Sequence, residues 1–127
     1  MTISITSWPQ SIDYRIIHDD SAGITVTSNA GGVPVMLHTA IIDNTAGTDE
    51  CFLKISDSVL AAAGSTEPTW LFICNSGKTA TYQIPGGLAC VSGLSFWLTR
   101  QEATSDQSAP AVSNNGTVKV TLFVSEM

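Results

Sequence analysis

Hydrophobic and polar residues alternate with a period of two along most of the chain, which is the pattern of half-buried β-strands. Val118, Val120, Leu122 and Val124 show it most clearly, because they fall on one face of an extended segment. Gly, Pro, Asn and Ser punctuate the pattern at strand-length intervals. The sequence therefore predicts short strands over residues 3–5, 14–18, 24–27, 35–42, 51–56, 69–74, 79–84, 88–91, 94–99 and 117–124.

The segments between these strands contain little helical signal. Residues 57–64 are the one helical candidate, with Asp57 as its cap and Gly64 as its end, and a loop is the alternative. Pro85-Gly86-Gly87 is expected to break the chain between two strands, and residues 101–115 form the longest predicted loop.

Without crossover helices between strands, a parallel α/β fold is excluded. The expected fold is all-β: an antiparallel two-sheet β-sandwich of jelly-roll or related Greek-key topology. We expect residues 1–127 to form a single β-sandwich domain, with residues 1–20 as an N-terminal arm or edge strand.

Charge limits the classes of partner. Only 13% of the 127 residues are charged and the formal net charge is −6. The five Lys and Arg residues are scattered, whereas nucleic acid and anionic lipid both select concentrated basic faces. Two long uncharged stretches, residues 21–42 and 79–99, contain too many Gly, Pro, Ser, Thr and Asn residues for membrane helices. We expect neither nucleic acid nor membrane as a partner, and the N-terminus does not resemble a secretory signal.

The residues that could carry chemistry form no recognised constellation. Cys51, Cys74 and Cys90 are odd in number and widely spaced, so we expect buried, reduced thiols rather than a disulfide framework or a metal site. His18-Asp19-Asp20 is expected to be a solvated turn, because adjacent residues of an extended chain point to opposite faces. His38 is expected to be a packed or interface histidine. No Gly-x-Ser-x-Gly motif occurs.

Acidic residues raise one metal hypothesis. Asp43, Asp49 and Glu50 bracket one loop and are a candidate calcium cluster, but their spacing does not match an EF-hand. The sequence therefore predicts a non-enzymatic protein with no catalytic residue, no cofactor and no metal. Among the functional hypotheses, a hydrolase is the least favoured.

The aromatic residues supply the candidate contacts. One face of each strand should be core, so an aromatic residue on the other face must be covered or must form a binding surface. Trp70, Phe96 and Trp97 are the candidates for a contact with a subunit or a sugar, although core packing is the favoured interpretation. Trp8, next to Pro9, is a fourth candidate, in a segment that could lie across a neighbour.

A series of short motifs extends over residues 35–124. The chain reads Ile41-Ile42-Asp43-Asn44-Thr45-Ala46, then Phe52-Leu53-Lys54-Ile55-Ser56-Asp57, Thr66-Glu67-Pro68-Thr69, Leu71-Phe72-Ile73, Ile84-Pro85-Gly86-Gly87-Leu88 and Val91-Ser92-Gly93-Leu94-Ser95. In this order the motifs resemble those of small β-sandwich virion structural proteins of tailed bacteriophages.

The resemblance implies a capsid decoration (cement) or head-fibre protein, made in the host cytoplasm and located on the capsid surface of the virion. It implies the major capsid protein and further copies of the chain, as a homotrimer, as partners. The alternative is a carbohydrate-binding or host-recognition module of a fibre or tail, with Trp70 and Trp97 stacking on sugar.

Overall fold

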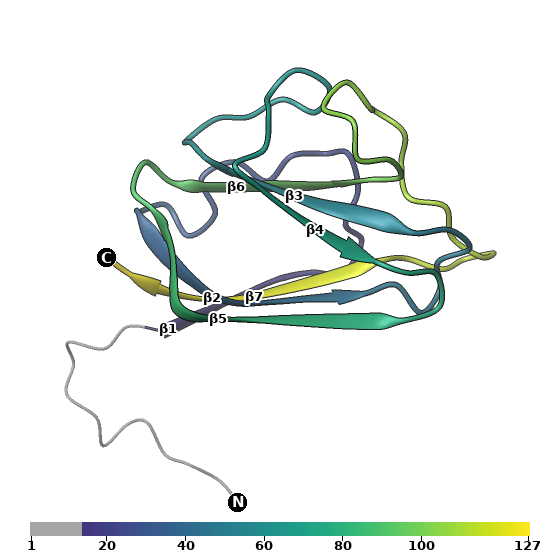
Figure 1. Ribbon diagram of the computed structural model, residues 1–127, viewed down its shortest axis with the longest axis horizontal. Helices are drawn as coiled ribbons and strands as arrows, with labels where there is room; N and C mark the ends of the chain where they lie inside the picture. Colours follow the sequence, from purple (N-terminus) through teal and green to yellow (C-terminus); the bar gives the residue numbers. More distant parts are fainter. Residues whose placement is uncertain (1–13) are drawn as a thin grey trace, which may run out of the picture.

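The computed structural model describes residues 14–127, which form seven strands in two antiparallel sheets (Figure 1). The larger sheet has the order β1-β7-β2-β5 and the smaller sheet the order β4-β3-β6. The strands are β1 (Tyr14–Asp19), β2 (Val35–Asp43), β3 (Cys51–Asp57), β4 (Trp70–Cys74), β5 (Thr79–Cys90), β6 (Leu94–Thr99) and β7 (Lys119–Glu126). The predicted all-β, two-sheet antiparallel sandwich is confirmed, whereas the jelly-roll subtype stays a prediction.

The core lies between the two sheets. Val120, Leu122 and Val124 of β7, and Val118 just before it, are all buried, as their spacing predicts. They pack with the alternate residues of β2 and with one face of β3 and β6. The buried apolar set at this interface includes Val35, Leu37, Ala40, Ile42, Leu53, Ile55, Leu94, Phe96 and Leu98.

The register of the larger sheet shifts near Pro85. Leu37 pairs with Leu88 and Thr39 pairs with Gln83, so residues 84–87 of β5 bulge opposite His38 of β2. Gly86 and Gly87 have φ of 82° and 77°, and a Cβ at Gly87 would lie 2.4 Å from Met36 Cγ. The expected break at Pro85-Gly86-Gly87 is therefore a bulge within one strand. The predicted strands 79–84 and 88–91 are corrected to the single strand β5.

Strands β3 and β6 of the smaller sheet are covered on both faces, whereas Leu71 and Ile73 on the outer side of β4 are exposed. The first six residues of β3 and all six of β6 are buried, although only alternate ones face the larger sheet. The β3–β4 and β6–β7 loops lie over the outer face (Figure 1). Residues 57–64, in the first of these loops, contain no helix, so the helical prediction is wrong and the loop alternative is correct.

The segment predicted as a strand at residues 24–27 is mostly irregular. It forms an isolated bridge between Thr27 and Phe96, and the Leu98 and Ala30 amides donate to Gly23 O and Leu94 O over 2.9 and 2.6 Å. The predicted strand is thus corrected to a segment that covers the free edge of β6. Within residues 14–127 there is no helix long and apolar enough to cross a membrane.

Candidate interaction surface

The outer face of the larger sheet is not covered by any described loop (Figure 1). Its residues follow from the register, because the alternate positions of each strand fill the core. We call this surface the open face. It comprises Ile16, His18, Thr39, Ile41, Asp43, Thr79, Thr81, Gln83, Lys119, Thr121, Phe123 and Ser125.

The open face is almost free of charge. Within its strands Asp43 and Lys119 are its acid and base, and they are register partners at one end of the sheet. The Asp20 carboxylate lies at its margin, beside His18. The Thr45 hydroxyl donates to Asp43 Oδ1 over 2.6 Å and, with the Thr45 amide and a smaller effect of Lys119, lowers the pKa of Asp43. This carboxylate is therefore already bonded within its own loop.

The rest of the open face consists mainly of apolar and hydroxyl side chains. One cross-strand row runs from Gln83 through Thr39 and Phe123 to Ile16, and the next runs from Thr81 through Ile41 and Thr121 to His18. Ile16 is 66% exposed, which is high for a large aliphatic residue in a strand. Depletion of charge around apolar residues is the compositional mark of a protein–protein interface core.

His18 lies at the margin of this face in a polar chain that the sequence did not predict. Its Nε2 is 2.6 Å from Asp20 Oδ1 and its Nδ1 is 2.8 Å from Thr121 Oγ1. The expected solvated turn is found at Asp20, which is exposed and follows β1, whereas His18 and Asp19 belong to the strand. Positions two apart in an extended segment share a face, which brings the His18 and Asp20 side chains together. The signal available in the sequence was this spacing of His18 and Asp20.

A hydroxyl, an imidazole and a carboxylate in a row are also the elements of nucleophilic catalysis. Thr121, however, is the middle of β7, and that strand pairs with β1 on one side and β2 on the other. Its neighbouring backbone amides belong to the sheet, so they cannot bind an oxyanion. We interpret the row of Thr121, His18 and Asp20 as a structural hydrogen-bond network that holds the edge strand β1 on β7.

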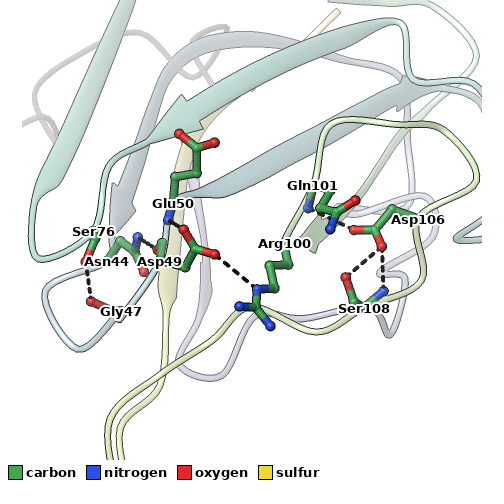
Figure 2. A network of polar contacts seen from close by, with 9 residues as sticks. All are labelled: Asn44, Gly47, Asp49, Glu50, Ser76, Arg100, Gln101, Asp106 and Ser108. Atoms are coloured by element: carbon green, nitrogen blue, oxygen red, sulfur yellow. Dashed lines mark hydrogen bonds and ion pairs between the residues drawn. The ribbon is translucent and has the colours of Figure 1, made fainter.

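A second polar network joins the loops at one end of the sandwich (Figure 2). Asn44 is fully buried, and its Nδ2 contacts the carbonyl oxygens of Asp49, Cys74 and Asn75 at 3.0, 3.3 and 3.1 Å. Ser76 Oγ donates to Gly47 O over 2.9 Å. The β2–β3 loop and the β4–β5 turn are therefore fixed to each other by side-chain amide and hydroxyl groups.

The same network reaches the β6–β7 loop. Arg100 Nε donates to Asp49 Oδ2 over 3.1 Å, and this bond, followed by the one from the Glu50 amide, lowers the pKa of Asp49. Both partners are about half-exposed, so the ion pair contributes little stability. Its effect is to hold the loop against the end of the sheet.

Asp106 organises the turn of that loop. Its carboxylate accepts hydrogen bonds from the Gln101 amide at 2.8 Å and from the Ser108 hydroxyl and amide at 2.6 and 3.1 Å. Burial alone would raise the pKa of Asp106, but these bonds and Lys54 outweigh it and lower the pKa. The ionised form is thus the one that closes the turn.

Replacing Asp106 with alanine should lower the free energy of unfolding by about 1 kcal/mol. Because the folded pKa is below the unfolded one, the contribution is present above the ordinary pKa of 3.8 and is lost as the pH falls through the lower folded value. Urea denaturation at pH 6 and at acid pH measures both effects. An alanine variant that differs equally from the parent at pH 6 and pH 2 would contradict this role of the charge.

The candidate calcium cluster does not converge. Asp49 directs its carboxylate at Arg100, whereas the Glu50 carboxylate points away from that pair (Figure 2). Asp43 bonds to Thr45 instead. Among residues 14–127 no group of three or more His, Cys, Asp or Glu side chains is arranged to hold a metal ion.

The predicted aromatic contacts are placed differently from one another. Phe96 is 2% exposed in the core and Trp97 is 1% exposed beneath the loops. The expectation of an exposed contact at either position is therefore corrected in favour of the packing alternative. Trp70 is half-buried against the core, and Trp8 lies outside the described residues.

The burial of the three cysteines and of His38 agrees with the sequence predictions. Cys51, Cys74 and Cys90 are all buried and unpaired, as expected of reduced thiols. His38 is partly buried where the register of β2 shifts against β5 and β7, with its Nε2 2.7 Å from Ser125 Oγ.

Comparison with known proteins adds no further constraint. No protein-family model matches the chain, and no curated protein or solved structure shows significant similarity to it.

Proposed function

We propose that this chain is a non-enzymatic virion structural protein that binds the outer surface of a phage capsid as a decoration protein. The open face is the observation that carries the proposal. It is a sheet surface that no described loop covers, and its central rows contain hydroxyl, amide, aliphatic, phenyl and imidazole side chains, with its Asp43–Lys119 pair at the end. The resemblance of residues 35–124 to virion proteins of tailed phages names the partner, the major capsid protein.

The chemistry of the open face suits a permanent contact. Threonine hydroxyls can form neutral hydrogen bonds across an interface, and the desolvation cost of buried charges is largely avoided. Ile41 and Phe123 supply apolar area at the centre of the rows, and Ile16 extends it to the edge strand β1. Such a protein stabilises a shell by mass action, because each bound copy favours the closed arrangement that it binds.

A charge placed on the open face should abolish binding to the capsid. In the variants Ile16→Glu and Thr81→Glu the exposed site tolerates the carboxylate in the free protein, while a contact would have to bury it at a cost of several kcal/mol. We expect at least a tenfold loss of occupancy on purified phage heads, measured by sedimentation and electron microscopy. The temperature at which the heads release DNA should fall to that of undecorated heads.

Leu71→Glu provides the matched control. Leu71 is 42% exposed on the outer side of β4, away from the open face, so the same substitution there should leave occupancy unchanged. Light scattering of the free chain tests self-association, and we expect a trimer. No occupancy of the parent chain on heads, or a loss of binding only in Leu71→Glu, would refute the proposal.

A further inference from the structure

Two of the three cysteines are cross-strand neighbours. Cys51 begins β3 and Cys74 ends β4, and they are direct partners in the antiparallel register of these strands. Both side chains belong to the same buried cluster between the sheets. Because the two cysteines are more than twenty positions apart, their spacing alone does not predict this contact.

The backbone at this pair suits a disulfide. Opposed residues of antiparallel strands have Cα atoms about 4.5 or 5.5 Å apart, according to the type of pair. Both separations lie within the range of about 4.4–6.8 Å that disulfides span. Cys90 does not share this placement, because it ends β5 in the other sheet and pairs with Val35.

We propose that Cys51 and Cys74 form a latent cross-strand disulfide, closed by a low-molecular-weight disulfide when the chain enters an oxidising environment. One thiolate attacks the small disulfide, forms a mixed disulfide and releases one small thiolate. The second cysteine thiolate then attacks the sulfur of the first and releases the other small thiolate. The two cysteine protons pass to the released thiolates, so two cysteines are oxidised and one small disulfide is reduced.

The same burial that brings the pair together keeps it reduced at first. Cys51 and Cys74 are 0% and 1% exposed. Burial, with a smaller contribution from the neighbouring Cys74 thiol, raises the pKa of Cys51 to about 12, and burial also raises the pKa of Cys74. Thiolate is the reacting form, so oxidation has to wait for the pair to be exposed.

The exposing motion is local. β4 is the edge strand of the smaller sheet, with β3 as its one neighbour in that sheet. Its opening uncovers both sulfurs without separating the larger sheet. Edge elements with few neighbours open at a lower free energy than the whole molecule unfolds. The disulfide, once formed, would then fix β4 to β3 and prevent that opening.

The experiment uses the full chain with oxidised glutathione at pH 8, with and without a urea concentration below the unfolding transition. We expect slow loss of two thiols, faster in urea, with a mass decrease of two hydrogens and a Cys51–Cys74 peptide in the unreduced digest. The Tm should rise by roughly 10 °C, as expected for a disulfide that closes a loop of this length.

Cys90→Ala is the matched control, because it removes a buried thiol and leaves the pair intact. It should oxidise and gain Tm as the parent does, whereas Cys51→Ala and Cys74→Ala should gain none. Each variant is compared with itself before and after oxidation, so any cost of the substitution cancels. A Cys90-containing disulfide, glutathione adducts alone, or no reaction in urea would overturn the proposal. Capsid binding is not measured in this experiment, so its result tests the disulfide independently of the proposed function.

Discussion

Replacing Asn44 with alanine should lower the free energy of unfolding by about 3 kcal/mol. The substitution removes the Nδ2 donor that reaches the carbonyl oxygens of Asp49, Cys74 and Asn75, in a residue with no exposed surface. The bond to the Cys74 carbonyl is buried, and a carbonyl that loses its donor there keeps the cost of its lost hydration. The Asn75 carbonyl still accepts from the Lys78 amide at 3.3 Å. Chemical denaturation monitored by tryptophan fluorescence measures the change.

Two further variants separate the amide from its surroundings. Asn44→Asp has nearly the same shape but turns the donor into an acceptor facing three carbonyl oxygens, so it should be at least as damaging as alanine. Thr45→Ala, at the exposed next position, should cost less than about 1 kcal/mol. An Asn44→Ala variant as stable as Thr45→Ala would show that the network in Figure 2 does not hold the loops.

This network also gives physical meaning to the Asp43-Asn44-Thr45 motif. Asp43 and Thr45 bond to each other at the start of the loop, and Asn44 points inward. Gly47 follows because a Cβ there would lie 1.9 Å from Asn44 Oδ1. The motif that suggested a family therefore closes one end of the sandwich through its own hydrogen bonds.

The alternation of residues predicted the central strand β7 well, because partners on both sides constrain it, and the strand appears where Val118–Val124 alternate. Strand β2 appears where the sequence predicts it, but its buried positions change phase at His38, where its register shifts against both neighbours. The strand prediction failed at residues 24–27, where pairing with a neighbouring strand decides whether a strand forms. Residues 24–27 have a strand-like composition, but a single bridge at Thr27 is all the pairing that β6 gives them.

The candidate site was harder to predict, because a sequence shows which residues share a face and not what covers that face. Trp97 and Ile16 both fall on outward positions of their strands, yet loops bury the first and leave the second 66% exposed. The convergence of His18 with Thr121 depends on a strand pairing between distant parts of the chain. The exposure of the open face therefore depends on where the loops lie in the fold, which the alternation of residues does not predict.

Replacing Trp97 with alanine should be the most damaging single change, at about 4 kcal/mol. Trp97 is 1% exposed and lies directly opposite Lys54, whose Nζ donates to Ala103 O over 2.6 Å in the loop above. Loss of the indole leaves a cavity beneath that loop and removes packing from the buried lysine. Differential scanning calorimetry would record the loss as a lower Tm.

Trp97→Phe and Trp70→Ala distinguish this role from that of a binding aromatic. Phenylalanine keeps most of the ring and removes an indole N–H that has no hydrogen-bond partner among the described residues, so Trp97→Phe should cost well under half of the alanine change. Trp70 is half-buried, and its alanine variant should also cost less than Trp97→Ala. If Trp97→Ala kept its Tm and lost affinity for capsid or glycan instead, the covering of the smaller sheet described above would be incorrect, and Trp97 would belong to the interaction surface.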